Sequence, residues 1–164
     1  MVKGMKTANW VYLEFVLGAI TKHQIVQWAA QLLTSVDPLC SHPGIIAIAE
    51  LCVIESIEWN IQPEDVLSEI VSIHFADFKI PSSETESMAQ EILREKCAGF
   101  LLGTLIQSEF FAVINSIHRY FGSLDWLGQL YFLSKQSRIY AGQENLSLIG
   151  LVNSTSYPSK AGYM

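Results

Sequence analysis

The chain has few charged residues and no long uninterrupted apolar run. Only 16% of its 164 residues are charged and 50% are hydrophobic, with a mean hydropathy of +0.28. A disordered chain has the opposite balance, so intrinsic disorder is excluded. Bases are scarcer than acids, ten against sixteen, and the net charge of −6 repels nucleic-acid backbones and anionic membranes. The sequence therefore predicts a folded acidic domain that binds neither.

The apolar windows are too short to predict a membrane helix. A spanning helix needs about 20 mostly apolar residues, and the best uncharged windows cover only residues 97–108 and 145–159. Lys3 and Lys6 precede an apolar stretch, as in a signal peptide, but polar residues interrupt that stretch and no cleavage site closes it. We therefore expect no membrane span and no signal peptide.

The few cysteines, histidines and glycines form no motif for a metal, a cofactor or a nucleophile. Cys40 and His42 are the one close Cys/His pair in the sequence, and no second pair lies at zinc-ligand spacing. The sequence contains no Gly-x-Ser-x-Gly elbow and no glycine-rich phosphate loop. We expect no metal, no cofactor and no enzyme activity. Three cysteines cannot all pair, which predicts free thiols and a cytoplasmic location.

Signals for helix starts and ends recur along the chain. They comprise capping-box spacings, prolines at possible first turns and glycines after apolar helical runs. In chain order these signals are Thr21 with Gln24, Pro43, Pro63, Ser83 with Glu86, Gly122 and Gly142. The predicted helices cover residues 8–20, 22–35, 44–59, 63–76, 84–106, 109–121 and 124–141. The expected fold is all-α, a compact multi-helix bundle of about seven helices in a single domain over residues 1–164.

Two of these helices have segments without a polar face. Residues 45–54 and 97–106 are apolar on nearly every side, and such helices must be surrounded by others. We therefore expect both to be central and buried, with Gly99 and Gly103 allowing close packing. Residues 45–54 also suit a buried strand, but a run of that length favours helix. Residues 71–75 alternate as a strand would, and there too we predict helix.

The sequence beyond Gly142 has a different character. Residues 146–152 form an apolar patch, and the last ten or so residues are small and polar. We predict that residues 143–164 comprise a docked segment followed by a loose tail.

The acidic residues are concentrated in the middle of the chain. Residues 50–96 hold eleven acids and three bases, a net charge of −8, whereas the remainder carries +2. One explanation is a solvated face plus acids in the first turns of helices. The other is a docking surface for a basic partner, because complementary charge speeds association and sets the orientation of binding.

In size, acidity, helical character and the acidic segment from Glu50 to Glu95, the chain resembles bacterial immunity proteins. The resemblance is to those that neutralise the nuclease toxins of contact-dependent growth inhibition systems. Such proteins bind a basic toxin domain tightly and cover its nucleic-acid-binding or catalytic cleft. The resemblance implies a non-enzymatic toxin inhibitor whose partner is a basic protein.

The candidate partner-binding residues form two groups. Carboxylates of the first group lie around the turn 59–63, and those of the second lie around 81–83. Trp59 either anchors the interface or packs at a helix end. The full set is Glu55, Glu58, Trp59, Glu64, Asp65, Glu69, Glu84 and Glu86. The alternative function is a helical adaptor or oligomerisation module that uses the apolar residues 146–152 or 126–132.

Overall fold

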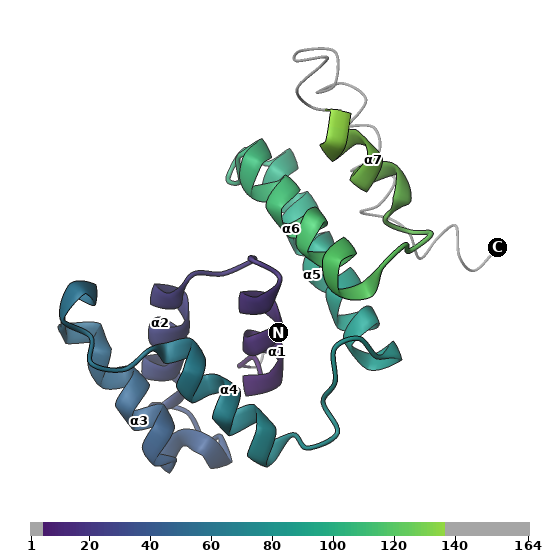
Figure 1. The fold of residues 1–164 in the computed structure, drawn as a ribbon. Coiled ribbons are helices and arrows are strands. Elements are labelled where there is room, and N and C mark those ends of the chain that lie inside the picture. The colour runs from purple at the N-terminus through teal and green to yellow at the C-terminus, as the bar shows by residue number, and fades with distance from the viewer. Residues whose placement is uncertain (1–4, 137–164) are drawn as a thin grey trace. The chain divides into compact units, whose positions relative to one another are not determined.

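The computed structural model describes residues 5–136, which form helices and turns. The elements are α1 (Ala8–Val16), α2 (Lys22–Leu32), η1 (Pro38–Ser41), α3 (Pro43–Glu50), η2 (Leu51–Val53), η3 (Ser56–Glu58), α4 (Pro63–His74), α5 (Ser83–Leu101), α6 (Gln107–Phe121) and α7 (Gly128–Gln136) (Figure 1). The prediction of an all-α, multi-helix fold is confirmed, and residues 71–74 belong to a helix. Within residues 5–136 every helix is too short or too polar to cross a membrane.

The chain divides into two compact units. The N-terminal unit comprises residues 1–16 and 20–79 and contains α1 to α4. The C-terminal unit comprises residues 17–19 and 80–164 and contains α5 to α7. The single domain over 1–164 stays a prediction. The expectations for residues 137–141 and 143–164 fall outside the described residues.

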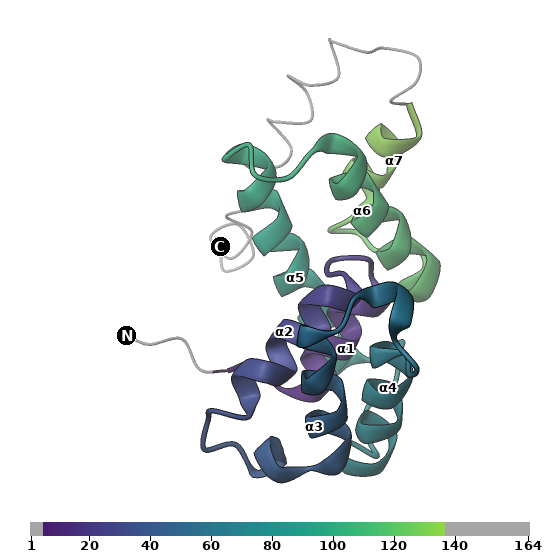
Figure 2. The same cartoon turned by 90° about the vertical axis from the view of Figure 1, so that its left-hand side faces the viewer.

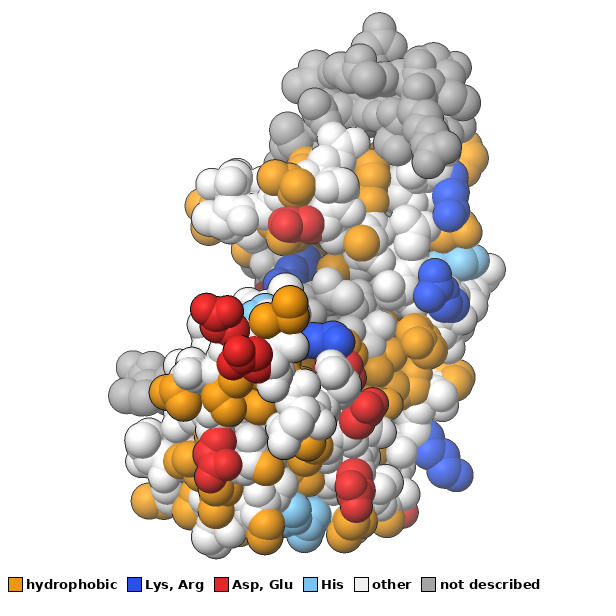
Figure 3. Space-filling view, turned by 60° about the vertical axis from the view of Figure 1, so that its left-hand side comes forward, with side chains coloured by type: hydrophobic (Ala, Val, Ile, Leu, Met, Phe, Trp, Pro, Cys, Tyr) orange, Lys and Arg blue, Asp and Glu red, His pale blue; other side chains and the backbone are white. Residues whose placement is uncertain are grey.

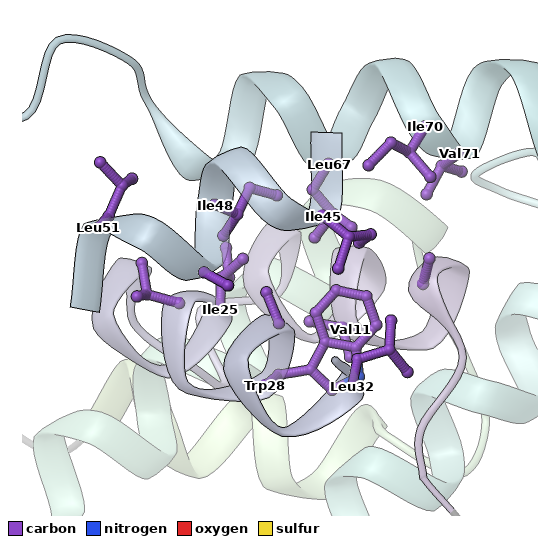
Figure 4. Packing of buried hydrophobic residues seen from close by; sticks show 14 residues of the cluster. Val11, Ile25, Trp28, Leu32, Ile45, Ile48, Leu51, Leu67, Ile70 and Val71 are labelled. Atoms are coloured by element: carbon purple, nitrogen blue, oxygen red, sulfur yellow. The ribbon is translucent and has the colours of Figure 1, made fainter. Parts of the chain in front are cut away.

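The N-terminal unit is built around one apolar cluster. In it α2 packs along α3 and α1 packs against α4, while α4 also contacts α2 and α3. Figure 4 shows Ile25 of α2, Ile45 and Ile48 of α3 and Leu67 of α4 converging, and all four are fully buried. Burial of each such side chain contributes about 1.5–3 kcal/mol. This core supports the surface segments described below.

In the C-terminal unit α6 packs against both α5 and α7 (Figure 2). Ile92 and Leu93 of α5 and Phe110 and Ile114 of α6 are fully buried. The rings of Phe100 and Phe110 stack with their centroids 5.1 Å apart. Apolar burial between α5 and α6 therefore holds this hairpin together.

Most helix starts lie where local sequence signals predict them. The Thr21 side chain caps α2, because its hydroxyl accepts from Gln24 N at 3.3 Å while Thr21 N donates to Gln24 Oε1 at 2.8 Å. Pro43 and Pro63 are the first residues of α3 and α4. At the end of α6, Gly122 has φ +77°, a left-handed conformation that favours glycine.

The capping box of α5 lies one residue earlier than predicted. Ser82, not Ser83, is the capping residue, and its hydroxyl accepts from Thr85 N at 3.1 Å. Ser82 N donates back to Thr85 Oγ1 at 2.8 Å. Thr85 is fully buried and takes the part that we assigned to Glu86. Two adjacent serines offer alternative caps, and the burial of Thr85 selects between them.

Two of the helices that end earlier than predicted, α1 and α5, are each followed by a left-handed glycine. The α1 helix stops before Gly18, at φ +73°, rather than at residue 20. The α5 helix stops at Leu101, and Gly103 follows at φ +78°. A methyl group at Gly103 would meet no atom within 4 Å, whereas one at Gly99 would lie 3.2 Å from a threonine hydroxyl. That threonine, Thr104, belongs to the turn that follows α5, so the close contact at Gly99 is local and not between helices, and Gly103 acts as a helix terminator.

The prediction of two central helices buried on all sides is wrong. In residues 45–54, Ile48 is fully buried but Val53 is 86% exposed. In residues 97–106, Leu102 is 79% exposed. The reason is that α3 and α5 end inside these segments, so the apolar residues after each helix end lie in turns. The predicted helix over 44–59 accordingly ends at residue 50.

Candidate functional site

The segment that follows α3 forms an exposed apolar ridge on the N-terminal unit. After Glu50 the chain passes through η2 and η3 at the outer edge of that unit (Figure 1). Leu51 is 3% exposed and holds the start of the segment in the core. Val53 and Ile57 are 86% and 88% exposed, and Ile54 is 40% exposed. We call residues 51–58 the ridge.

Backbone hydrogen bonds hold the ridge in one conformation. Ile54 N donates to Leu51 O at 3.1 Å, and Glu58 N donates to Glu55 O at 2.8 Å. These bonds close two successive 3-10 turns with extended backbone at Ile54 and Glu55 between them. The ridge is therefore an ordered surface feature.

Trp59 closes the ridge at its far end. The indole Nε1 donates to Ile54 O at 3.0 Å, and Trp59 N donates to Ser56 O at 3.2 Å. The ring lies with its centroid 5.0 Å from that of His23 on α2 and packs at the edge of the core cluster. The structure thus gives Trp59 a supporting role. A direct contact between Trp59 and a partner stays a prediction.

Unneutralised carboxylates flank the apolar side chains of the ridge. Glu50, Glu55 and Glu58 are all exposed. Within residues 5–136 none of the three makes an ion pair. Figure 3 views this side of the N-terminal unit, where acidic side chains lie directly beside hydrophobic ones. The surface therefore combines apolar area with negative charge.

The other predicted carboxylates of the first group have different environments. Asp65 and Glu69 are exposed on α4, with no ion pair inside the described range. Glu64 is engaged, because Lys22 Nζ lies 3.0 Å from its Oε1. Lys22 also donates to Gln62 Oε1 at 2.9 Å, so it links the start of α2 to the loop before α4. Glu64 is thus placed to hold the unit together.

The second predicted group is divided in the same way. Glu84 is exposed in the first turn of α5. Glu86 is half-buried and accepts from Trp126 Nε1 at 3.2 Å, which joins α5 to the loop before α7. Of the two glutamates, Glu84 alone lacks a partner among the described residues.

The negative charge belongs mostly to one unit. The N-terminal unit holds nine acids and four bases, a net charge of −5. The C-terminal unit holds seven acids and six bases, a net charge of −1. The N-terminal unit therefore carries nearly all of the net charge of −6, and it also carries the ridge.

The histidines and cysteines do not assemble into a metal-binding group in the part of the chain that is described. The rings of His42 and His74 meet edge-on with centroids 5.1 Å apart, and His42 Nδ1 is occupied as acceptor for Gly44 N at 2.9 Å. All three cysteines are free. Cys52 is exposed on the ridge, whereas Cys97 is fully buried and burial raises its thiol pKa to about 12. Cys97 is therefore a poor nucleophile near neutral pH.

Each unit also has a shallow cavity. One of about 400 Å³ lies beside α2, where the buried Glu14 accepts from Lys6 Nζ at 2.9 Å. The other, of about 300 Å³, lies beside α6 and α7, where the rings of His118 and Tyr131 stack with centroids 3.7 Å apart. At its edge Phe132 is 59% exposed. His118, Ser123 and Lys135 also line this second cavity, and among the described residues no hydrogen bond joins His118 to Ser123.

The residues that the sequence analysis missed are the apolar ones of the ridge. Val53 was predicted to lie in the buried apolar segment 45–54, and Ile57 in the same predicted helix over 44–59. Consecutive β-branched residues gave no signal for the end of α3, because Ile45 and Ile46 form such a pair inside the helix. Compared with protein-family models, curated proteins and solved structures, the chain has no match.

Proposed function

We propose that the chain is a non-enzymatic binding protein that neutralises a basic toxin domain of the nuclease class, as an immunity protein does, by covering its active-site cleft. One observation carries the proposal: exposed carboxylates without a basic partner in the described range are concentrated on one unit of net charge −5. The carboxylates of the predicted set that meet this description on the N-terminal unit are Glu55, Glu58, Asp65 and Glu69.

The physical basis is charge complementarity. A nuclease cleft carries lysine and arginine side chains that bind phosphates, and carboxylates held on a folded unit can pair with the same side chains. Such pairing raises the association rate and orients the two proteins. The same negative charge repels nucleic acid, so the inhibitor itself does not bind the toxin's substrate.

The contacts inside the unit refine the set of interface residues. Glu64 is held by Lys22 and Glu86 by Trp126, so these two carboxylates already make contacts within the chain and are not assigned to the interface. Glu55, Glu58 and Glu84 are free to meet a partner. Free thiols at all three cysteines are compatible with the reducing cytoplasm in which we place the protein.

The test uses the protein encoded immediately upstream of this chain's gene, which the proposal predicts to be a basic toxin domain. We expect co-expression of the chain to restore growth of cells that produce that protein. A fourfold variant should bind it about fourfold or more weakly, because each exposed charge at an interface rim contributes about 0.2–1 kcal/mol and four contribute at least about 0.8 kcal/mol. The fourfold variant is Glu55→Gln, Glu58→Gln, Asp65→Asn and Glu69→Gln.

The matched control removes exposed acids from the other unit. Glu109→Gln with Asp125→Asn lowers the negative charge on the C-terminal unit, and we expect it to bind as the wild type does. Growth that the chain fails to restore, or equal weakening by the two variants, would remove the N-terminal unit from the proposed interface.

The alternative is an adaptor or oligomerisation module that uses residues 126–132, since Phe132 is 59% exposed beside a cavity. The two leucines of that patch are interior, since Leu127 and Leu130 are 1% and 2% exposed. An apolar interface of this kind is nearly insensitive to salt. Self-association that persists unchanged at high ionic strength would favour this alternative. The apolar residues 146–152, the other patch considered, fall outside the described residues.

A further inference from the structure

We propose that the ridge is the hydrophobic centre of the partner interface, and that it takes a basic polypeptide surface in which an apolar pocket is rimmed by lysine or arginine. The proposal rests on the proposed function for the class of partner. It goes beyond that function by assigning the anchoring contacts to Val53 and Ile57, which are aliphatic.

The first argument is the exposure of the ridge. Isolated apolar side chains are common on protein surfaces and need no explanation. Here Val53 and Ile57 are 86% and 88% exposed, and Ile54 between them is 40% exposed. All three belong to one short segment whose ends, at Leu51 and Trp59, pack into the core. Exposure of several large apolar side chains at one place marks an interaction surface.

The second argument is preorganisation. The turn bonds at Ile54 and Glu58 and the indole bond from Trp59 hold the ridge in its free form. A partner that binds it does not have to order the segment first, so less conformational entropy is lost on binding. Beyond the ridge, Lys22 bonds both Gln62 and Glu64 in the loop and helix that follow.

The third argument, the charge around the ridge, identifies the occupant. Glu50, Glu55 and Glu58 are exposed and make no ion pair among the described residues. A second copy of this chain would bring the same carboxylates, and a unit of net charge −5, against them. Like charges placed together disfavour that arrangement, whereas a rim of lysine or arginine complements it.

The experiment selects peptides on the intact protein. The probe is a phage-displayed library of random peptides about 16 residues long, long enough to present an apolar segment with basic flanks. We expect enriched peptides to combine large apolar residues with lysine or arginine. The ridge variant Val53→Ser with Ile57→Ser should bind synthetic copies of them about tenfold or more weakly, because it keeps every charge but loses the apolar contacts.

Two further variants separate the contributions. Val36→Ser with Ile73→Ser removes exposed apolar groups elsewhere on the same unit, where the side chains are 102% and 62% exposed, and should bind as the wild type does. Neutralisation of the rim, by Glu50→Gln, Glu55→Gln and Glu58→Gln, should weaken binding at low salt and flatten its salt dependence. All of these positions are exposed, so the variants should unfold as the wild type does.

The outcomes distinguish this inference from the proposed function. Enriched peptides that lack basic residues, or that bind the ridge variant as tightly as the wild type, overturn the inference. A dimer of the wild type that dissociates in the ridge variant also overturns it, because the occupant is then a second copy. If the ridge variant neutralises the toxin as well as the wild type, the inference fails and the proposed function stands. If basic peptides bind the ridge but no toxin is neutralised, the inference stands and the proposed function fails.

Discussion

The bond from Trp59 to the ridge yields the most detailed prediction. Trp59→Phe keeps an aromatic ring against His23 but removes the donor that reaches Ile54 O at 3.0 Å. A hydrogen bond of this kind contributes about 1 kcal/mol net. Because 1.4 kcal/mol is a factor of ten in an equilibrium constant, we expect the population of opened ridge to rise about fivefold.

Amide hydrogen exchange measures this population directly. The amides of Ile54, Glu58 and Trp59 all donate within the turns of the ridge, so each should exchange about fivefold faster in Trp59→Phe. The matched control is Trp28→Phe, which removes an indole bond to Lys6 O of 2.9 Å elsewhere in the same unit. It should leave the local opening of the ridge unchanged. Unchanged exchange in Trp59→Phe, or equal acceleration in both variants, would refute the claim that Trp59 holds the ridge.

Three further predictions concern stability. Ile48→Ala should lower the free energy of unfolding by about 2–5 kcal/mol in chemical denaturation, because Ile48 is fully buried, whereas Val53→Ala should stay within about 0.5 kcal/mol. Lys22→Met should cost about 1–3 kcal/mol by the same assay, because it leaves the half-buried Glu64 without its cation, and Glu64→Gln in the same background should recover part of that loss. Burial raises the pKa of Cys97 from 9.0 to about 12, so the folded state holds this proton more tightly than the unfolded state does. The stabilisation that comes from this difference in pKa is complete below pH 9.0 and is lost as the pH rises toward about 12. The stability of the wild type relative to Cys97→Ala should therefore fall over that range.

The parts of the fold that follow from adjacent residues could be predicted from the sequence. The starts of α2, α3 and α4 depend on Thr21, Pro43 and Pro63, and each acts on the backbone within one turn. The end of α6 at Gly122 is of the same kind. Thr21 accepts a terminal amide, each proline occupies a first-turn position where no N–H is needed, and Gly122 adopts φ +77°. None of these effects needs a distant contact.

The helix ends that depend on tertiary contacts could not be predicted in this way. The α3 helix stops at Glu50 although the apolar pattern continues, because Leu51 is drawn into the core and the Trp59 indole takes the carbonyl of Ile54. A helical projection does not contain that contact. The cap at Ser82 was missed for a similar reason, since the burial of Thr85 selects it.

The candidate site was predicted in its charge but not in its apolar part. The concentration of acid between residues 50 and 95 is visible in the sequence. Which carboxylates are already engaged is not, because Lys22 reaches Glu64 and Trp126 reaches Glu86 across long stretches of chain. Exposure of the apolar residues follows from the early end of α3, so that error in the fold concealed the ridge.

The central claim is that the N-terminal unit docks a basic protein through its exposed carboxylates. The most direct test is the affinity for the protein encoded upstream, which we predict to be a basic toxin domain, measured by titration calorimetry from about 50 mM to about 500 mM salt. We predict that affinity falls steeply with salt for the wild type, and falls much less for the fourfold variant at Glu55, Glu58, Asp65 and Glu69. Identical salt dependence in the two proteins would contradict the claim.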